Sequence, residues 1–193
     1  MNKRILLIRH GEVSPGYEER FIGKTDPPLS RGGVAAARQL RERIASMHPD
    51  RFYCSPLRRA VETLEAVGGK ECGAVFDPRL AEIDFGRWEN LLFNDILADS
   101  TPDLIRTWAD DTAHFQFPGG ESYQEFAQRV DEFMEELYED ASKVVAVVTH
   151  GGVLMRILSV WKGIPPNRQC EVLPPRGSLS IYEYQDGVAS HVE

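Results

Sequence analysis

Two apolar runs of this sequence each end on a histidine. The run at 5–8 is followed directly by Arg9 and His10, and a second run, rich in β-branched residues, leads to His150. A neutral imidazole can act as a nucleophile near pH 7. The arginine beside it presents a planar fork of donors that suits phosphate oxygens. For Arg9 and His10 alone, the alternative is an ordinary polar turn at the end of a strand.

A third segment adds cations at an expected helix start. Ser55 and Pro56 are typical of a helix N-terminus, and Arg58 and Arg59 follow in the first turn. Clustered guanidiniums need an anion to pair with, and the N–H groups at the starts of helices favour the same guest. A dianionic phosphoryl group fits this combination. One histidine would attack phosphorus while the other donates a hydrogen bond to its oxygens.

The leaving oxygen would also need a proton, and the stretch "LAEIDFG" offers two carboxyl groups. Glu82 is the first candidate for the proton donor, and Asp84 is the reserve. A metal site built from these carboxylates with His10 and His150 is disfavoured, because the adjacent arginines would repel a cation. We therefore expect neither a metal nor a cofactor.

Hydrophobic patterns indicate which elements position these residues. Apolar runs predict strands at 5–8, in "RFYC", in "GAVFD" and in "KVVAVVTHGG", and the last of these has the unbroken apolar character of a central parallel strand. The segments "SLSIYEY" and "VASHV" predict a terminal hairpin across the turn "QDG".

Helices are expected between these strands. Ser30 is predicted to cap a helix whose core positions recur at steps of three and four, ending near His48. Ser55 is predicted to cap a second helix, with Pro56 at its first position. Ser122 and Glu125 have capping-box spacing and predict a third helix. A fourth should follow Gly151 and Gly152. Segment 80–120 shows only short helical stretches, and Trp88 and Trp108 within it are expected to be packing anchors.

Alternation of strands and helices predicts an α/β fold. We expect a doubly wound, mostly parallel sheet with helices on both faces, a terminal antiparallel hairpin, and a cap-like insertion at about 84–120 over the carboxyl edge of the sheet. One domain should span residues 1–193. Ligands of such sheets bind beyond the carboxyl ends of the strands. His10, Ser55 and His150 are all expected at that edge.

Composition excludes several classes of function. The chain has 193 residues, of which 42% are hydrophobic, and a net charge of −8. That charge disfavours binding to nucleic acid or to an anionic membrane. Three cysteines without close spacing suggest neither a disulfide framework nor a zinc site, and no run approaches the length of a membrane span. A cytoplasmic protein is expected, with a homodimer left open.

Six motifs in this order resemble the histidine phosphatase superfamily, also called phosphoglycerate mutase-like. They are "RHGE" from Arg9, "TDPPLSRGG" from Thr25, "SPLRRAVET" from Ser55, "AEIDFGRWE" from Ala81, "PGGES" from Pro118 and "THGG" from Thr149. The tripeptide RHG alone would be weak evidence, but the set covers most of the chain.

The resemblance implies a role for each matching position. His10 would become a phosphohistidine, Glu82 would donate the proton, and His150 would be the second histidine of the phosphate pocket. Arg9 and Arg59 would hold the phosphoryl oxygens. Arg58 falls on a more variable position. Beside these roles, we expect Gly11 to let the backbone approach the anion closely, and the helix N-terminus at Gly151 to add backbone N–H groups for it. Family members need no metal for this step, and water would then release phosphate.

Two departures from the family pattern affect substrate contacts. Val13 replaces the usual Thr or Ser of the motif, and Gly16 stands near where many members have an asparagine that touches the phosphate. Ser14 and Arg20 are the candidate substitutes.

The predicted function is a phosphomonoesterase for a small phosphorylated metabolite, with α-ribazole phosphate as one candidate. A phosphoglycerate mutase is the alternative enzyme, disfavoured because family mutases are generally longer. A phosphate-binding module without activity is the alternative outside catalysis, and the candidate proton donor Glu82 argues against it.

Overall fold

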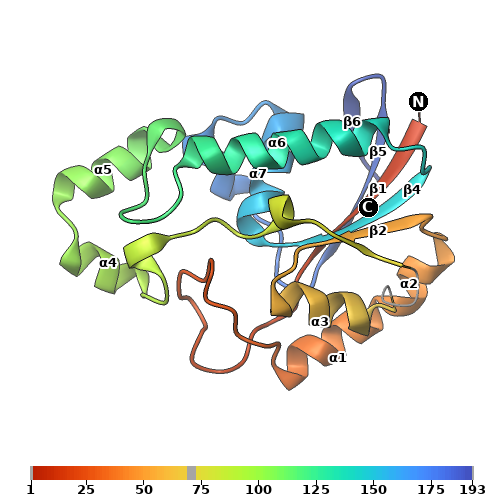
Figure 1. Ribbon diagram of the computed structural model, residues 1–193, viewed down its shortest axis with the longest axis horizontal. Coiled ribbons are helices and arrows are strands. Elements are labelled where there is room, and N and C mark those ends of the chain that lie inside the picture. The colour runs from red at the N-terminus through yellow and green to blue at the C-terminus, as the bar shows by residue number, and fades with distance from the viewer. Residues whose placement is uncertain (1, 69–72, 193) are drawn as a thin grey trace.

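A six-stranded sheet organises the computed structural model, which describes residues 2–68 and 73–192 (Figure 1). The strand order is β3-β2-β4-β1-β5-β6. The strands are β1 (Asn2–Arg9), β2 (Arg51–Cys54), β3 (Val75–Phe76), β4 (Val144–Thr149), β5 (Leu179–Gln185) and β6 (Val188–His191). The first four strands in this order are parallel to one another. Strand β5 is antiparallel to β1, and β6 is antiparallel to β5. The predicted α/β fold with a terminal hairpin is confirmed.

Seven α-helices and several 3₁₀ turns surround this sheet in the described residues. The helices are α1 (Arg31–Gln39), α2 (Arg41–Ser46), α3 (Arg58–Ala66), α4 (Phe93–Asp99), α5 (Pro102–Asp110), α6 (Tyr123–Glu139) and α7 (Gly151–Lys162). The 3₁₀ turns are η2 (Pro78–Leu80), η3 (Gly86–Trp88), η4 (Thr112–His114) and η5 (Pro166–Val172). Within the same residues, no helix is both long and apolar enough to cross a membrane.

Strand β4 lies between β2 and β1 and is buried on both faces, as its sequence predicted. Side chains of successive residues in a strand point to opposite faces. Val145 and Val147 accordingly join the core under α6 and α7, while Ala146 and Val148 join the core under α1 and α3. The helices therefore cover both faces of the sheet, which explains why β4 shows no polar alternation.

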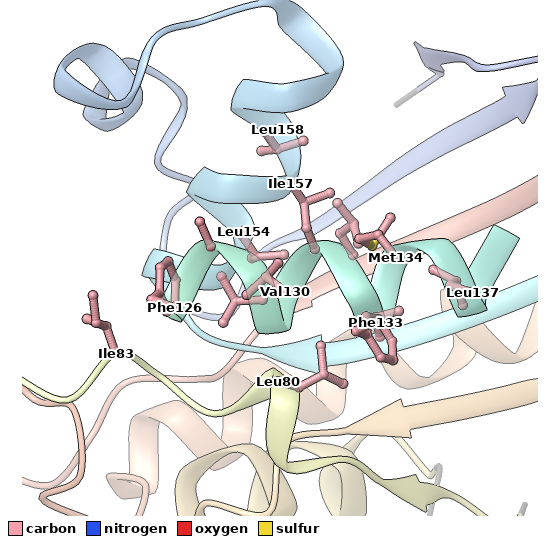
Figure 2. Packing of buried hydrophobic residues seen from close by; sticks show 14 of the residues in the cluster. Leu80, Ile83, Phe126, Val130, Phe133, Met134, Leu137, Leu154, Ile157 and Leu158 are labelled. Carbon is pink, nitrogen blue, oxygen red and sulfur yellow. The ribbon is translucent and has the colours of Figure 1, made fainter. Parts of the chain in front are cut away.

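Helix α6 packs across the face that it shares with α7 (Figure 2). Ser122 caps it by accepting a hydrogen bond from the Glu125 N–H, and the Glu125 carboxylate accepts one from the Ser122 N–H. The predicted capping box is therefore confirmed. Phe126, Val130 and Phe133 recur on one side of α6 and face the core.

Two helices differ from the predictions, one in its continuity and one in its start. The helix expected to run unbroken to His48 is divided at Leu40 into α1 and α2. The helix expected from Ser55 begins at Arg58 instead. The Ser55 hydroxyl contacts His150 Nε2 and also accepts from the Leu57 N–H at 3.3 Å, while the first helical N–H, that of Arg58, donates to the Asp26 carboxylate at 2.9 Å. A side chain from a distant loop thus adds to the local contact that Ser55 makes.

The segment between β3 and α6 carries α4 and α5 on the side toward which the parallel strands point, at the left of Figure 1. Trp88 is almost fully buried and packs edge-on against Trp108 and Phe117, with ring centroids 5.1 and 5.5 Å apart. These contacts support the predicted packing role of Trp88. Trp108 is only partly buried, and it also lines the cavity that contains His10.

Candidate active site

The carboxyl ends of β1 and β4 bring the two predicted histidines into contact. Arg9 pairs with Thr149 in the parallel register, and the His10 N–H donates to the Thr149 carbonyl at 2.9 Å. The imidazole centroids of His10 and His150 are consequently 5.2 Å apart. Both side chains are buried, with exposed fractions of 5% and 0%.

The hydrogen bonds of His10 identify its free nitrogen. Its Nδ1 lies 2.7 Å from the Gly11 carbonyl oxygen, which can only accept, so Nδ1 carries the proton. Nε2 then keeps a lone pair. Burial, followed by the charge of Arg59, lowers the pKa of His10 to about 3. The ring is therefore neutral at physiological pH, as a nucleophile requires.

His150 contacts a different partner. Its Nε2 lies 2.6 Å from the Ser55 hydroxyl, which reaches it from the end of β2. Its Nδ1 is buried and has no hydrogen-bond partner among the described residues. Burial, and then the charge of Arg59, holds the pKa of His150 well below its ordinary value. If Ser55 donates to Nε2, the Nδ1–H of the neutral ring is available to a ligand.

Arg59 is completely buried beside these rings, and its guanidinium is held by a turn of the preceding loop. It donates to the carbonyls of Ile22, Gly23 and Thr25 at 3.2, 3.0 and 2.9 Å. Asp26 lies 3.5 Å from the same group. Only its Nε remains buried without a partner among the described residues.

Arg9 also has a buried Nε without a hydrogen-bond partner among the described residues. Its Nη1 donates to the Pro174 carbonyl, while its Nε is buried and unpartnered. Burial lowers the pKa of Arg9 to about 10, so it stays charged at neutral pH. Of the five buried side-chain atoms without a partner in the described residues, three therefore belong to this site: Arg9 Nε, Arg59 Nε and His150 Nδ1. Unpaired buried donors are costly, and here all three suit an oxyanion.

Glu89 binds the turn whose carbonyls accept from Arg59, and the sequence analysis did not identify Glu89. Its carboxylate accepts hydrogen bonds from the backbone N–H groups of Gly23, Lys24 and Thr25, and from the Thr25 hydroxyl at 2.7 Å. The same turn therefore gives its N–H groups to Glu89 and its carbonyls to Arg59. The only signal in the sequence was the position of Glu89 at the end of the motif "AEIDFGRWE".

Glu82 lies in the same cavity as Arg9 and His10. Its carboxylate accepts from the N–H groups of Gly152 and Ile83, both at 3.0 Å. A Cβ on Gly152 would lie 2.2 Å from Glu82 Oε1, so glycine is needed there for the carboxylate to reach helix α7. Gly152 is a second residue whose role the sequence did not reveal.

Arg129 on α6 fixes the backbone that carries Glu82. Its guanidinium donates to the carbonyls of Arg79 and Ala81 at 2.7 Å and to that of Glu82 at 3.2 Å, and it pairs with Glu121. The sequence analysis did not single out Arg129.

The other sequence candidates lie elsewhere. Asp84 pairs with Lys24 at 2.6 Å and is not among the residues that line the cavity of His10, so it is poorly placed as a reserve proton donor. Arg58 is exposed and pairs with Glu62.

Gly11 and Gly151 are small for different reasons. The Gly11 N–H is already engaged by the Thr63 hydroxyl at 3.0 Å, and a Cβ would lie 2.8 Å from the Gly33 carbonyl. The close approach at Gly11 is thus to Gly33 of helix α1. Gly151 does line the cavity, where a Cβ would lie 3.0 Å from Arg9 Nη2.

The cavity has a volume of about 360 Å³ and two chemically distinct parts. Its charged and histidine lining consists of Arg9, His10, Glu19, Arg20, Glu82 and Arg176. Much of the remaining wall is apolar and comes from several regions of the chain: Phe21, Ile22, Ile83, Phe85, Trp108, Phe117, Tyr123, Phe126, Met155 and Leu173. A phosphoryl group suits the polar part, and an apolar group suits the rest.

Comparison with known families agrees with this arrangement. A family model described as histidine phosphatase superfamily (branch 1) matches residues 5–193. The chain belongs to this superfamily. The predicted family is thereby confirmed, and the names of its relatives support a phosphatase.

Relatives within the superfamily differ in the substrates that their names give. The chain is 32% identical to phosphoserine phosphatase 1 of Hydrogenobacter thermophilus, over 76% of this chain and 70% of that protein. It is 30% identical to a probable phosphoglycerate mutase of an Enterobacter species, over 95% and 86%. The crystal structure of a putative α-ribazole-5′-P phosphatase from Escherichia coli superposes with a TM-score of 0.87 at 28% identity, covering 98% and 94%.

One of the two departures from the superfamily pattern has a local structural explanation. Val13 is buried and forms an antiparallel bridge with Leu29. Arg20, one candidate substitute for the phosphate-contacting asparagine, donates to the carbonyls of Gly16 and Asn90 at 2.8 and 2.6 Å while lining the cavity. A contact of Arg20 or Ser14 with phosphate stays a prediction. The homodimer and the cytoplasmic location also stay predictions.

Potential metal ligands are dispersed in the described part of the chain. In 2–68 and 73–192, no three His, Cys, Asp or Glu side chains are grouped so that they could hold one ion. The described thiols, Cys54 and Cys170, are both free, and Cys72 lies outside the described residues.

The two buried neutral imidazoles predict a specific dependence of stability on pH. Because the folded-state pKa values of His10 and His150 are lowered, the unfolded chain binds protons below about pH 6.5 that the folded chain does not. Their contribution to stability is therefore present above that pH and lost as the pH falls. Between pH 7.5 and 5, His10 should remove about 2 kcal/mol from the free energy of unfolding, and His150 acts in the same direction.

Urea unfolding in a phosphate-free buffer at both pH values measures this loss. His10→Gln should lose about 2 kcal/mol less stability than the wild type over this range, whereas His48→Gln, at an exposed turn, should keep the wild-type dependence. An unchanged pH dependence in His10→Gln would contradict the buried neutral state of His10.

Proposed function

We propose that this protein hydrolyses phosphomonoesters through a phosphohistidine at His10, without a metal ion. The observation that carries the proposal is the unprotonated Nε2 of a buried, neutral His10, set among buried and unpartnered N–H groups of Arg9, Arg59 and His150. A nucleophile surrounded by donors that have no partner in the described residues suits attack on a phosphoryl group.

In the first step, His10 Nε2 forms a bond to phosphorus and the ester P–O bond breaks. Glu82, in its protonated form, gives its proton to the leaving oxygen, so that the product is a neutral alcohol. In the second step, the Glu82 carboxylate takes a proton from water, which attacks phosphorus and breaks the P–N bond. Inorganic phosphate leaves, and His10 and Glu82 return to their starting forms.

Positive charge in the site would stabilise the phosphoryl oxygens. Arg9 Nε, Arg59 Nε and His150 Nδ1 are the donors proposed for the non-bridging oxygens, and Gly151 opens the first turn of α7 to the same region. These groups are held by protein contacts before a substrate arrives, so little reorganisation is needed as charge develops.

The cavity wall favours one class of substrate. Apolar and aromatic side chains surround most of the space beyond His10, among them Phe21, Trp108 and Phe117. We propose a phosphomonoester whose alcohol carries a flat apolar group. α-Ribazole phosphate, after which the similar Escherichia coli phosphatase is named, fits this description better than phosphoserine or phosphoglycerate.

The phosphohistidine can be tested directly. The wild type should hydrolyse an aryl phosphate in the presence of a chelator and accumulate an acid-labile, alkali-stable phosphoenzyme. His10→Ala should lose at least about a thousandfold in turnover and all of the phosphoenzyme, because the nucleophile is gone. His48→Ala should retain both. Activity that appears only on adding a divalent metal would refute the proposal.

The role of Glu82 can be separated from that of His10 by varying the leaving group. Glu82→Gln should lower kcat/KM for alkyl phosphates by about 10² to 10⁴, because an alkoxide needs the proton. For p-nitrophenyl phosphate, whose leaving group is stable without a proton, the loss should be within about tenfold. Asp84→Asn, outside the cavity, should keep the wild-type pattern. An equal loss for both substrates would exclude Glu82 as the donor.

A panel of substrates tests the apolar wall. Naphthyl phosphate and α-ribazole phosphate should exceed phosphoserine and 3-phosphoglycerate in kcat/KM by about 10- to 100-fold, the range expected from burying one apolar ring. Trp108→Ala should reduce this ratio. Faster turnover of phosphoserine would contradict the proposed class, and isomerisation of 3-phosphoglycerate without phosphate release would favour the mutase.

A further inference from the structure

The segment after η5 is tied to the catalytic strand at three points. The Arg9 N–H donates to the Ser178 carbonyl at 3.1 Å, and the Gly177 N–H donates to the His10 carbonyl at 2.9 Å. The Arg9 guanidinium reaches the Pro174 carbonyl from the other side. Positions 174–178 are therefore held against Arg9 and His10, although Arg9 and Pro174 are 165 positions apart in the sequence.

Arg176 lies in the middle of this segment and lines the cavity together with Arg9, His10 and Glu82. It is partly buried, and no hydrogen bond or ion pair joins its guanidinium to another residue in the described part of the chain. Arg168, eight positions earlier, is paired with Glu171, and Arg20 across the cavity donates to two carbonyls. Arg176 thus has its full set of donors available.

The charge of Arg176 is felt at the catalytic residues. After burial and Arg59, it is among the positive charges that lower the pKa of His10, and after burial it also lowers the pKa of Arg9. Three guanidiniums, those of Arg9, Arg59 and Arg176, therefore act on one small region. The Glu82 carboxylate offsets part of this charge, and the remainder costs free energy unless an anion is bound among the arginines.

The donors of the other two arginines are largely occupied by the protein. Arg59 uses both terminal nitrogens for backbone carbonyls and Asp26, and Arg9 uses part of its fork for Pro174. Each leaves a buried Nε for a ligand. Three non-bridging oxygens of a phosphoryl dianion can accept more hydrogen bonds than these two atoms and His150 Nδ1 supply.

We propose that Arg176 is a third phosphate-binding arginine, which donates through its guanidinium fork to the non-bridging oxygens of the phosphoryl group. The inference rests on the proposed function, because it assigns a further substrate contact to the same site. The proposal places one phosphate-binding arginine on the segment after η5, in addition to Arg9 on β1 and Arg59 on α3. Arg176 is therefore expected to act on every phosphomonoester, whatever its alcohol.

Binding of inorganic phosphate tests this assignment without relying on turnover. Arg176→Gln should raise the dissociation constant of phosphate, measured by titration calorimetry, by at least about tenfold, because one charged bidentate contact is lost. Arg176→Lys should recover part of this affinity, since it keeps the charge and loses the fork. Arg168→Gln, which changes an exposed arginine close by in sequence, should bind phosphate like the wild type.

Kinetics with two substrates separates this role from recognition of the alcohol. With p-nitrophenyl phosphate, which has no second anionic group, Arg176→Gln should lose at least about tenfold in kcat/KM. If p-nitrophenyl phosphate and inorganic phosphate are unaffected while 3-phosphoglycerate alone is lost, Arg176 binds a substrate carboxylate and the proposal is overturned. If no ligand is affected, Arg176 is a solvated side chain and the proposal is equally overturned.

The same measurements separate failure of the binding role from failure of the proposed function. A wild type that binds phosphate through Arg176 but turns over no phosphomonoester would refute the function and leave the binding role intact. An active wild type whose Arg176→Gln variant binds phosphate normally would refute only the binding role. Because no hydrogen bond or ion pair joins Arg176 to another described residue, we expect the urea midpoints of both Arg176 variants to match the wild type, so that reduced binding reports on the site.

Discussion

Arg9 on β1 pairs with Thr149 on β4, and this register decides which side chains meet beyond the sheet. Because the two strands are parallel, the residue that follows each of them lies at the same edge, and these residues are His10 and His150. A slip of one position would turn one imidazole toward the opposite face. The apolar residues of β4 alone would not prevent such a slip, because they are apolar on both faces. The register is fixed by packing, since a different set of β4 side chains is buried under the helices on each face.

Electrostatics then determine the state of these imidazoles. Burial beside arginines keeps both rings neutral, which favours a nucleophile at His10 and a donor at His150. The arginines themselves are held by backbone carbonyls, and the turn that binds Arg59 is itself bound by Glu89. Positive charge is thus stabilised by oriented dipoles and a more distant carboxylate, which leaves the inner donors to an anionic ligand.

The regions far from the sheet edge contribute positioning and selectivity. Arg129 on α6 fixes the backbone of Glu82, and Gly152 on α7 makes room for its carboxylate. The segment that carries α5 brings Trp108 to the apolar wall, while the segment after η5 brings Arg176 to the polar part. In the proposed complex, the phosphoryl end of a ligand is therefore contacted mainly by residues from the sheet edge, and its alcohol by residues from the surrounding segments.

The sequence by itself determined the strands, the order of the main helices and the candidates Arg9, His10, Glu82 and His150, because apolar runs, capping residues and short motifs are local signals. It could not place Glu89, Arg129 or Arg176, because no local pattern distinguishes them from solvated charges. The turn bound by Glu89 and the backbone bound by Arg129 lie dozens of positions away, and only folding brings Arg176 to the cavity. The predicted start of α3 was wrong for a related reason: the N–H of its first residue donates to Asp26, a side chain from a distant loop, while Ser55 contacts both the Leu57 N–H and His150. Only the tertiary structure decided which charges are satisfied by the protein and which are left for a ligand, because that depends on contacts formed when the whole chain is packed.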